Sequence, residues 1–172
     1  MTSVDELLLV LLGAEPGSAY DLQRRHAEIF GTVRQLDIAR VRAAVNRLER
    51  GGYLRTEAVL PVRKDTMNRP LCHLTPAGVR RQHTWLTAVR ADSTADEVYV
   101  RGMVAVELAD PAVFDAFLAE ALASATRRRQ DLSDAGSLRA PTSGARAAFE
   151  WEQVDALVRW LERLPTYRRS TV

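Results

Sequence analysis

The chain has 172 residues, a hydrophobic content of 47%, one cysteine and a formal net charge of +2. This length supports one compact domain or two small ones, and the apolar fraction is sufficient for a core. A single cysteine excludes an internal disulfide, and the longest apolar run, residues 7–12, is too short to span a bilayer. Because the sequence also shows no signal-peptide pattern, we expect a cytoplasmic protein with no membrane partner.

The charge is divided unevenly along the sequence. Residues 1–90 hold 14 basic and 9 acidic side chains, a net charge of +5, whereas residues 91–172 hold 10 and 13, a net charge of −3. A basic half joined to an acidic half is typical of proteins in which one part meets phosphate and the other meets protein. We therefore expect a change of role near residue 90.

Three short amphipathic helices are predicted in the first fifty residues. The first begins with the capping-box spacing of Ser3 and Glu6 and stops before Pro16, and it has apolar residues at Val4, Leu7, Leu8 and Leu11. Ser18 caps the second helix, which ends at Gly31. Asp37 caps the third, which ends at the glycine pair 51–52. Helices this short bury their apolar stripes only against one another.

The sequence pattern changes after the third helix. Residues 53–75 are rich in Val, Leu and Thr, and two prolines bracket a polar, basic stretch at 62–69. This pattern predicts a β-hairpin with a long basic tip. Thr75 and Pro76 then predict the start of a fourth helix, which continues through Val79, Leu86 and Val89. Three helices, a hairpin and a helix are the order of a winged helix-turn-helix domain.

The third helix carries a polar face of arginines separated by small residues. Small side chains let a helix approach a surface closely, and the planar guanidinium group bonds phosphate or both acceptors of guanine. The alternative is an ordinary solvated helix face. We predict DNA contacts from Arg40, Arg42, Ala43, Asn46, Arg47 and Arg50 in this helix and from Arg63, Lys64 and Arg69 at the hairpin tip.

The second half predicts long helices joined by a polar link. One helix is expected within 93–110, a second begins after Asp110, and a link at 133–146 precedes a last helix over 147–165. The last helix is apolar over too wide an arc for one neighbour, so we expect this half to form a homodimer. The predicted interface residues are Phe114, Phe117, Leu118, Trp151, Leu157, Trp160 and Leu161.

Three segments resemble the PadR-type transcriptional regulators. They read GSAYDLQRR at 17–25, RVRAAVNRLERGGYLR at 40–55 and CHLTPAGVRRQHTWL at 72–86. The ending WLERL, after two long helices, is similar to the C-terminal dimerisation region of that family. The resemblance implies a winged helix-turn-helix domain at 1–90, a helical dimerisation domain at 91–172, and the function of a repressor.

Catalytic, cofactor and metal patterns are not found in the sequence. Its three histidines are far apart, and neither a glycine-rich phosphate loop nor a nucleophile motif occurs. We therefore predict that the protein is not an enzyme and uses no cofactor and no metal. Trp85 and Met103 mark the place where we expect a small aromatic or hydrophobic effector to bind.

The sequence as a whole predicts a mainly α fold with a small β-hairpin wing. Its expected function is that of a homodimeric regulator that binds a palindromic operator in double-stranded DNA. A MarR-like regulator is an alternative of the same class. Two alternatives from other classes stay open: a winged helix that binds an acidic protein without reading DNA, and a helical half that serves chiefly as a small-molecule sensor.

Overall fold

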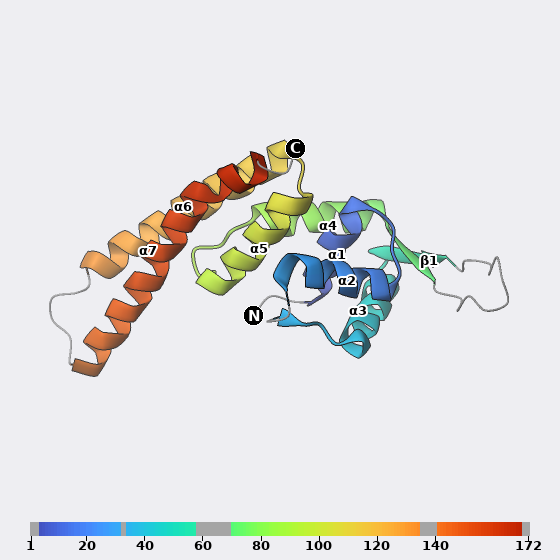
Figure 1. Ribbon diagram of the computed structural model, residues 1–172, viewed down its shortest axis with the longest axis horizontal. Coiled ribbons are helices and arrows are strands. Elements are labelled where there is room, and N and C mark those ends of the chain that lie inside the picture. The colour runs from blue at the N-terminus through green and yellow to red at the C-terminus, as the bar shows by residue number, and fades with distance from the viewer. Residues whose placement is uncertain (1–3, 32–33, 58–69, 135–140, 170–172) are drawn as a thin grey trace. The chain divides into compact units, whose positions relative to one another are not determined.

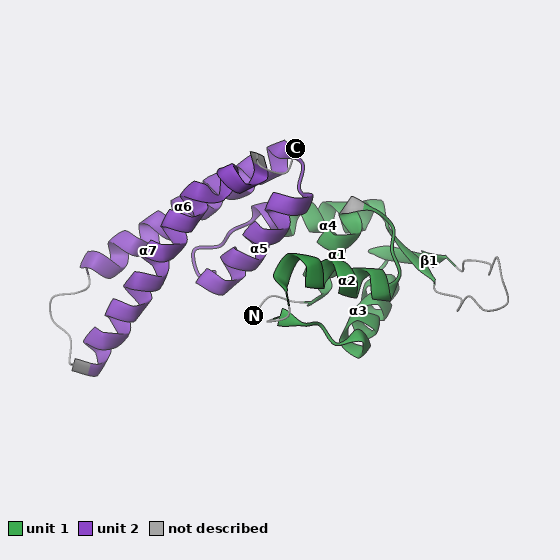
Figure 2. Cartoon of the chain, in the orientation of Figure 1, with its two compact units in different colours: residues 1–85 green, residues 86–172 purple. Residues whose placement is uncertain are grey.

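A computed structural model describes residues 4–31, 34–57, 70–134 and 141–169. The chain forms two compact units, Met1–Trp85 and Leu86–Val172, which we call the winged-helix unit and the helical unit (Figures 1 and 2). The structure confirms the predicted fold class, because helices dominate both units and the described strands form one antiparallel hairpin. The predicted division of roles near residue 90 stays a prediction.

The winged-helix unit follows the predicted order of three helices, a hairpin and a helix. Its elements are α1 (Val4–Ala14), α2 (Ala19–Phe30), α3 (Ile38–Arg50), β1 (Leu54–Glu57), β2 (Leu71–Leu74) and α4 (Pro76–Thr87), whose last residues belong to the helical unit. In the hairpin, Leu54 lies opposite Leu74 and Glu57 opposite Leu71. The predicted extension of α4 to Val89 is wrong, since α4 ends at Thr87.

Helix α1 is the centre of the winged-helix unit. Every side chain from Leu7 to Leu12 is buried, because α1 packs against α2, α3 and β2. The apolar residues named from the sequence did not include Leu9 and Val10, which are enclosed as fully as Leu8 and Leu11. A helix with neighbours on several sides is apolar all round.

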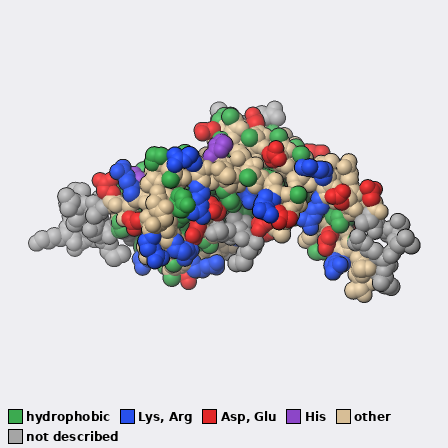
Figure 3. All heavy atoms as spheres, turned by 180° about the vertical axis from the view of Figure 1, so that it is seen from behind, with side chains coloured by type: hydrophobic (Ala, Val, Ile, Leu, Met, Phe, Trp, Pro, Cys, Tyr) green, Lys and Arg blue, Asp and Glu red, His purple; other side chains and the backbone are tan. Residues whose placement is uncertain are grey.

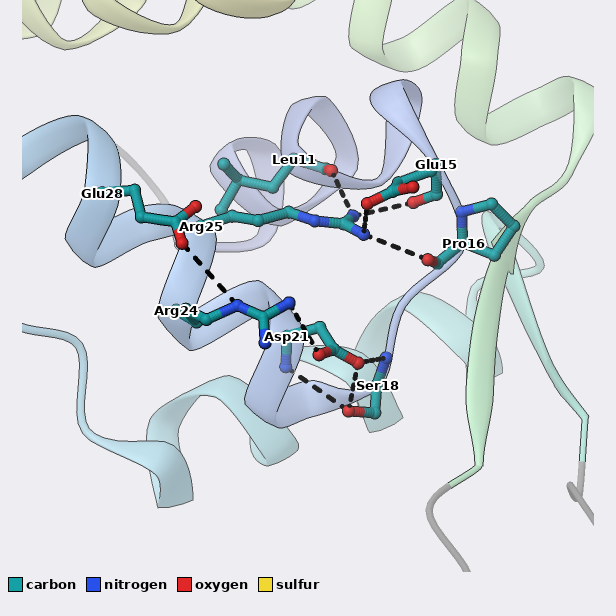
Figure 4. Close-up of polar contacts among 8 residues, drawn as sticks. All are labelled: Leu11, Glu15, Pro16, Ser18, Asp21, Arg24, Arg25 and Glu28. Atoms are coloured by element: carbon teal, nitrogen blue, oxygen red, sulfur yellow. Dashed lines mark hydrogen bonds and ion pairs between the residues drawn. The ribbon is translucent and has the colours of Figure 1, made fainter. Parts of the chain in front are cut away.

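The C-terminal end of α1 is capped by Arg25 of α2 (Figure 4). Its Nη1 donates to the carbonyl oxygens of Leu11 at 3.0 Å and Glu15 at 2.8 Å. Its Nη2 donates to the Glu15 carboxylate at 2.7 Å and to the Pro16 carbonyl at 3.1 Å. The last carbonyls of a helix have no partner within it and attract a cation. Arg25 therefore stabilises the fold rather than facing a ligand.

The predicted cap of α2 is confirmed (Figure 4). The carboxylate of Asp21 accepts from the amide and the hydroxyl of Ser18 at 2.9 and 2.7 Å. These hydrogen bonds hold the pKa of Asp21 below its usual value. The charged carboxylate also lies in the first turn, where the helix dipole favours it.

A glycine and two hydrogen bonds lie between the end of α2 and the start of α3. Gly31 ends α2 with a φ of 65°, which favours glycine. The side chain of Gln23 donates to the carbonyl of Leu36 at 2.7 Å, and Asp37 caps α3 by accepting from the Ala39 amide at 2.7 Å. Together these contacts set the direction in which α3 leaves the turn.

The junction between the hairpin and α4 depends on Thr75 and Gly78. The Thr75 hydroxyl donates to the carbonyl of Gly52 at 2.7 Å and accepts from the Gly78 amide at 3.2 Å. A Cβ atom at position 78 would lie 2.0 Å from the carbonyl oxygen of Tyr53. Only glycine allows this approach between the start of α4 and Tyr53, the residue before β1.

The helical unit consists of α5 (Ala95–Leu108), α6 (Pro111–Asp134) and α7 (Pro141–Arg169), each packed against the other two. The prediction for the last helix is wrong at both ends, because α7 begins at Pro141 instead of Ala147 and continues past Pro165. Within the four described ranges, none of the helices combines the length and the hydropathy that crossing a membrane requires.

Arg168 explains why α7 extends beyond its internal proline. A proline inside a helix removes one hydrogen bond and favours a break. The guanidinium of Arg168 donates to the carbonyls of Ala105 at 3.2 Å and Ala109 at 2.6 Å, at the end of α5, and lies 4.8 Å from the ring centre of Phe114. These tertiary contacts hold the last turn in place.

The first prediction concerns Gly78. Gly78→Ala should lower the free energy of unfolding by about 1–3 kcal/mol, because backbone at the hairpin junction must move to admit the methyl group. The matched control is Gly144→Ala in α7, where a Cβ atom meets nothing within 4 Å. The control should raise stability by about 0.5–1 kcal/mol. Urea unfolding of both variants measures the difference, and equal effects would contradict the close approach.

The second prediction concerns the buried His26 of α2. Burial lowers its pKa, and the charge of Arg34 lowers it further. The unfolded chain takes up this proton near pH 6.5, whereas the folded chain does so only at a lower pH. The free energy of unfolding should therefore fall as the pH drops below about 6.5. His26→Leu should flatten this decline in urea titrations between pH 7 and 5, and an unchanged slope would contradict the assignment.

Candidate nucleic-acid interface

The exposed side of α3 carries every residue of this helix that was predicted to contact DNA. Val41, Ala44, Val45 and Leu48 are turned into the core. The exposed side chains are those of Ala39 and Glu49 together with the six predicted residues Arg40, Arg42, Ala43, Asn46, Arg47 and Arg50. We call the six predicted residues the α3 face. Figure 3 shows basic side chains gathered on the winged-helix unit, with acidic ones interspersed.

The arginines of the α3 face differ in their contacts. Arg42 donates to the Tyr20 hydroxyl at 2.8 Å, with its guanidinium carbon 5.2 Å from the centre of that ring. Arg50 donates to the carbonyl of Asn46 within its own helix at 3.3 Å. Arg40 is exposed, and no ion pair or hydrogen bond of its guanidinium is seen among the described residues. These arginines therefore offer their charge to solvent or to a ligand.

Arg47 forms an ion pair with Asp5 of α1. Its Nη2 lies 2.6 Å from Oδ1 of Asp5 and its Nε lies 3.1 Å from Oδ2. This carboxylate raises the pKa of Arg47. The side chain of Asp5 is 17% exposed and that of Arg47 is 50% exposed, so the acid lies underneath and the guanidinium reaches the surface. Asp5 could not be predicted as part of the interface, because no local pattern in the sequence links residues 5 and 47.

A second carboxylate in the same turn of α1 binds α4. Glu6 accepts from Nη2 of Arg81 at 2.6 Å and from its Nε at 3.0 Å. The Arg81 guanidinium also lies 4.4 Å from the ring centre of Tyr53. These contacts raise the pKa of Arg81, with the hydrogen bond to Glu6 as the largest cause. Adjacent acids on α1 thus hold α3 and α4.

A groove of about 430 Å³ lies between the start of α2, the outer side of α3 and the hairpin. Tyr20 and Arg42 line one side of it, and Glu49 and Thr56 line the other. The carboxylate of Glu49 accepts from the Thr56 amide at 3.0 Å and also from its hydroxyl. This contact ties β1 to α3, and it fixes the base of the hairpin beside the α3 face.

Cys72 lies in the same groove and is buried in β2. Burial, followed by the negative charge of Glu49, raises its thiol pKa to about 11. The thiol is therefore protonated near neutral pH and behaves as a small apolar side chain.

The predicted wing contacts lie outside the described residues. They are Arg63, Lys64 and Arg69, all within 58–69. The base of the hairpin adds one basic side chain that was not predicted from the sequence, the exposed Arg55 of β1. In the hairpin Arg55 lies opposite His73.

The residues predicted for dimerisation fall into two groups. Phe114, Phe117 and Leu161 are buried within the helical unit, so its own core uses them. Trp151 is exposed, and Leu118, Leu157 and Trp160 are half-buried. The predicted effector residues, Trp85 at the end of the winged-helix unit and Met103 in α5, are each half-buried. The roles of both sets stay predictions.

Four apolar side chains of α7 lie on one side of the helix at helical spacing. They are those of Phe149, Ala156, Trp160 and Tyr167, which we call the α7 stripe. Phe149 is 61% exposed and Tyr167 is 55% exposed. A wide apolar arc on this helix was predicted from the sequence, but Tyr167 was not part of that prediction.

Comparison with known proteins gives matches to solved structures only. No protein-family model and no curated protein matches the sequence. Bacillus subtilis PadR in complex with operator DNA is 17% identical, with 95% of this chain and 98% of that chain covered and a TM-score of 0.47. The same protein in complex with p-coumaric acid is 18% identical, with 95% of this chain and 98% of that chain covered and a TM-score of 0.41. The PadR-like transcriptional regulator BC1756 from Bacillus cereus is 14% identical, with 96% of this chain and 98% of that chain covered and a TM-score of 0.40. The chain is thus similar to PadR-type regulators over nearly its whole length, at identities too low to transfer residue roles.

The third prediction concerns the tie between α3 and the hairpin. Glu49→Ala should lower the free energy of unfolding by about 1 kcal/mol, because the amide and the hydroxyl of Thr56 lose the carboxylate that accepts their hydrogen bonds. The loss is small because this carboxylate is exposed. Alkylation of the Cys72 thiol should become faster at the same time. Glu57→Ala is the matched control, since it removes an exposed carboxylate from β1 that lies 3.5 Å from His73 Nε2. Equal thiol reactivity in the two variants would contradict the tie.

Proposed function

We propose that this protein is a sequence-specific DNA-binding transcriptional regulator that acts as a repressor in the cytoplasm. The observation that carries the proposal is the α3 face, where arginines stand beside small side chains on the outer surface of a helix-turn-helix. Helices of this kind enter the major groove, and small residues let the helix axis come close to the bases.

The surroundings of the α3 face suit DNA better than a protein partner. The groove beside it is lined by the Tyr20 hydroxyl and the Arg42 guanidinium, and the single carboxylate among the described residues of its lining, Glu49, accepts hydrogen bonds from Thr56. Hydroxyl and guanidinium groups are common donors to backbone phosphate. In our proposal Arg40 and Arg42 contact phosphates on the two sides of the DNA major groove, and Asn46 and Arg47 reach base edges. The hairpin tip adds affinity with little sequence preference.

We further propose that the protein binds a palindromic operator as a homodimer. One winged helix covers too few bases for tight specific binding, whereas two copies related by a twofold axis read two half-sites. The α7 stripe supports this part of the proposal, because Phe149 and Tyr167 are exposed and lie on the same side of the helix as the half-buried Trp160. A small aromatic or hydrophobic effector that binds the helical unit would relieve repression by changing the spacing of the two α3 helices.

The fourth prediction tests the DNA interface. Arg40→Gln and Arg42→Gln in the full chain should each weaken binding to duplex DNA. Because each variant removes one interaction with phosphate, it should also flatten the salt dependence by about 0.9 in logarithmic slope. Arg80→Gln is the matched control, since it removes the same charge from an exposed position on α4. Binding is measured by fluorescence anisotropy on duplexes selected from a random-sequence pool. Unchanged binding of both α3 variants would contradict the proposal, and a failure of duplex DNA to bind at all would favour an acidic protein partner.

The fifth prediction tests the dimer. Phe149→Glu should shift the full chain from dimer to monomer in sedimentation at micromolar concentration, because a charge in an apolar seam must be desolvated. Ala148→Glu adds the same charge at the neighbouring exposed position, off the stripe, and should leave the dimer intact. A wild-type chain that sediments as a monomer would contradict this part of the proposal.

A further inference from the structure

We propose that Asp5 is a specificity-determining residue: it holds Arg47 so that this arginine reads a guanine instead of bonding backbone phosphate. The inference rests on the proposed DNA-binding function and extends it in two ways. It names the base that the α3 face recognises at this position, and it assigns a role in recognition to a residue of α1.

The geometry of the ion pair leaves one edge of the guanidinium unused. Asp5 accepts from Nε and from one N–H of Nη2, at 3.1 and 2.6 Å, and so occupies the inner edge of Arg47. The outer edge consists of Nη1 and the second N–H of Nη2. Among the described residues, no hydrogen bond from Nη1 is seen. The half-exposed guanidinium therefore offers two parallel donors away from α1.

Two parallel donors match guanine in the major groove. The O6 and N7 acceptors of guanine accept both N–H groups of one arginine edge, and this is the commonest specific contact between proteins and DNA. Ala43 lies one turn before Arg47 on the exposed side of α3, and its small side chain leaves room for a base pair beside the guanidinium. Adenine and the pyrimidines lack this pair of acceptors.

The carboxylate beneath the guanidinium also disfavours phosphate. A free arginine on a helix surface follows the nearest phosphate and gains affinity for every sequence equally. Asp5 fixes the side chain before DNA arrives, so less rotamer freedom is lost on binding. Its negative charge repels a phosphate that approaches Arg47, whereas a neutral base edge meets no such repulsion. The pair therefore raises the difference between specific and non-specific binding.

The test compares Asp5→Asn with Glu6→Gln in the full chain. Both variants remove one negative charge from the first turn of α1, and both weaken an ion pair with an arginine. Each protein selects sites from a duplex pool with a randomised central segment, and its binding to a fixed duplex of unrelated sequence is measured against salt. Thermal unfolding shows whether each variant is folded.

The proposal predicts a change in one variant only. Wild type and Glu6→Gln should select a guanine at one position of each half-site with a preference of roughly five- to a hundredfold. Asp5→Asn should lose most of this preference for guanine, and the position affected should be the one at which Arg47→Ala also loses its preference. It should also bind the unrelated duplex more tightly, with a salt slope steeper by about 0.9. In the Arg47→Ala background, Asp5→Asn should have no further effect on base preference.

The possible outcomes separate this inference from the proposed function. If the wild type selects no sequence, the proposed function fails. If the wild type selects a site and Asp5→Asn selects the same site with the same preference, the function stands and the role of Asp5 is refuted. Loss of preference at every position, or an equal loss in Glu6→Gln, would likewise refute it, because either result reflects a general loosening of the fold.

Discussion

The winged-helix unit depends on the first turn of α1, where two adjacent carboxylates bind arginines from different helices. Asp5 holds Arg47 of α3, and Glu6 holds Arg81 of α4. Helix α1 cannot shift to accommodate its partners, because the side chains that follow this turn are buried on all sides. The ion pairs are partly exposed and each contributes little to stability by itself. Their importance is geometric, since they connect the surface of the unit to its buried central helix.

This arrangement divides the arginines of the unit by role. Arg25 and Arg81 are used by the fold, the first at the end of α1 and the second between α1 and Tyr53. Arg40 and Arg42 keep their charge available at the surface, and Arg47 belongs to both groups. A count of basic residues therefore overstates the positive charge that a ligand meets. Only the tertiary contacts show which basic side chains are available to a ligand.

Local signals in the sequence predicted most elements of the fold. Capping residues such as Ser18 and Asp37, and the glycines that end α2 and α3, act within a few residues and need no tertiary information. The outer side of α3 was equally predictable, because it follows from helical periodicity alone. The predictions failed where distant contacts override local preference. Pro165 should end a helix, but Arg168 finds carbonyl acceptors on α5 and holds the turn beyond it.

The same limit applies to the candidate interface. The identity of its arginines could be read from the sequence, but their orientation could not, because Tyr20 and Asp5 approach α3 from other helices. The hairpin is positioned in the same way, through Glu49 and Thr56 on one side and the close approach of Gly78 to Tyr53 on the other. Recognition of a base needs side chains placed within fractions of an ångström. In the proposed interface that placement would depend on residues that approach α3 from other elements, so substitutions of those residues should change base preference more than overall affinity for DNA.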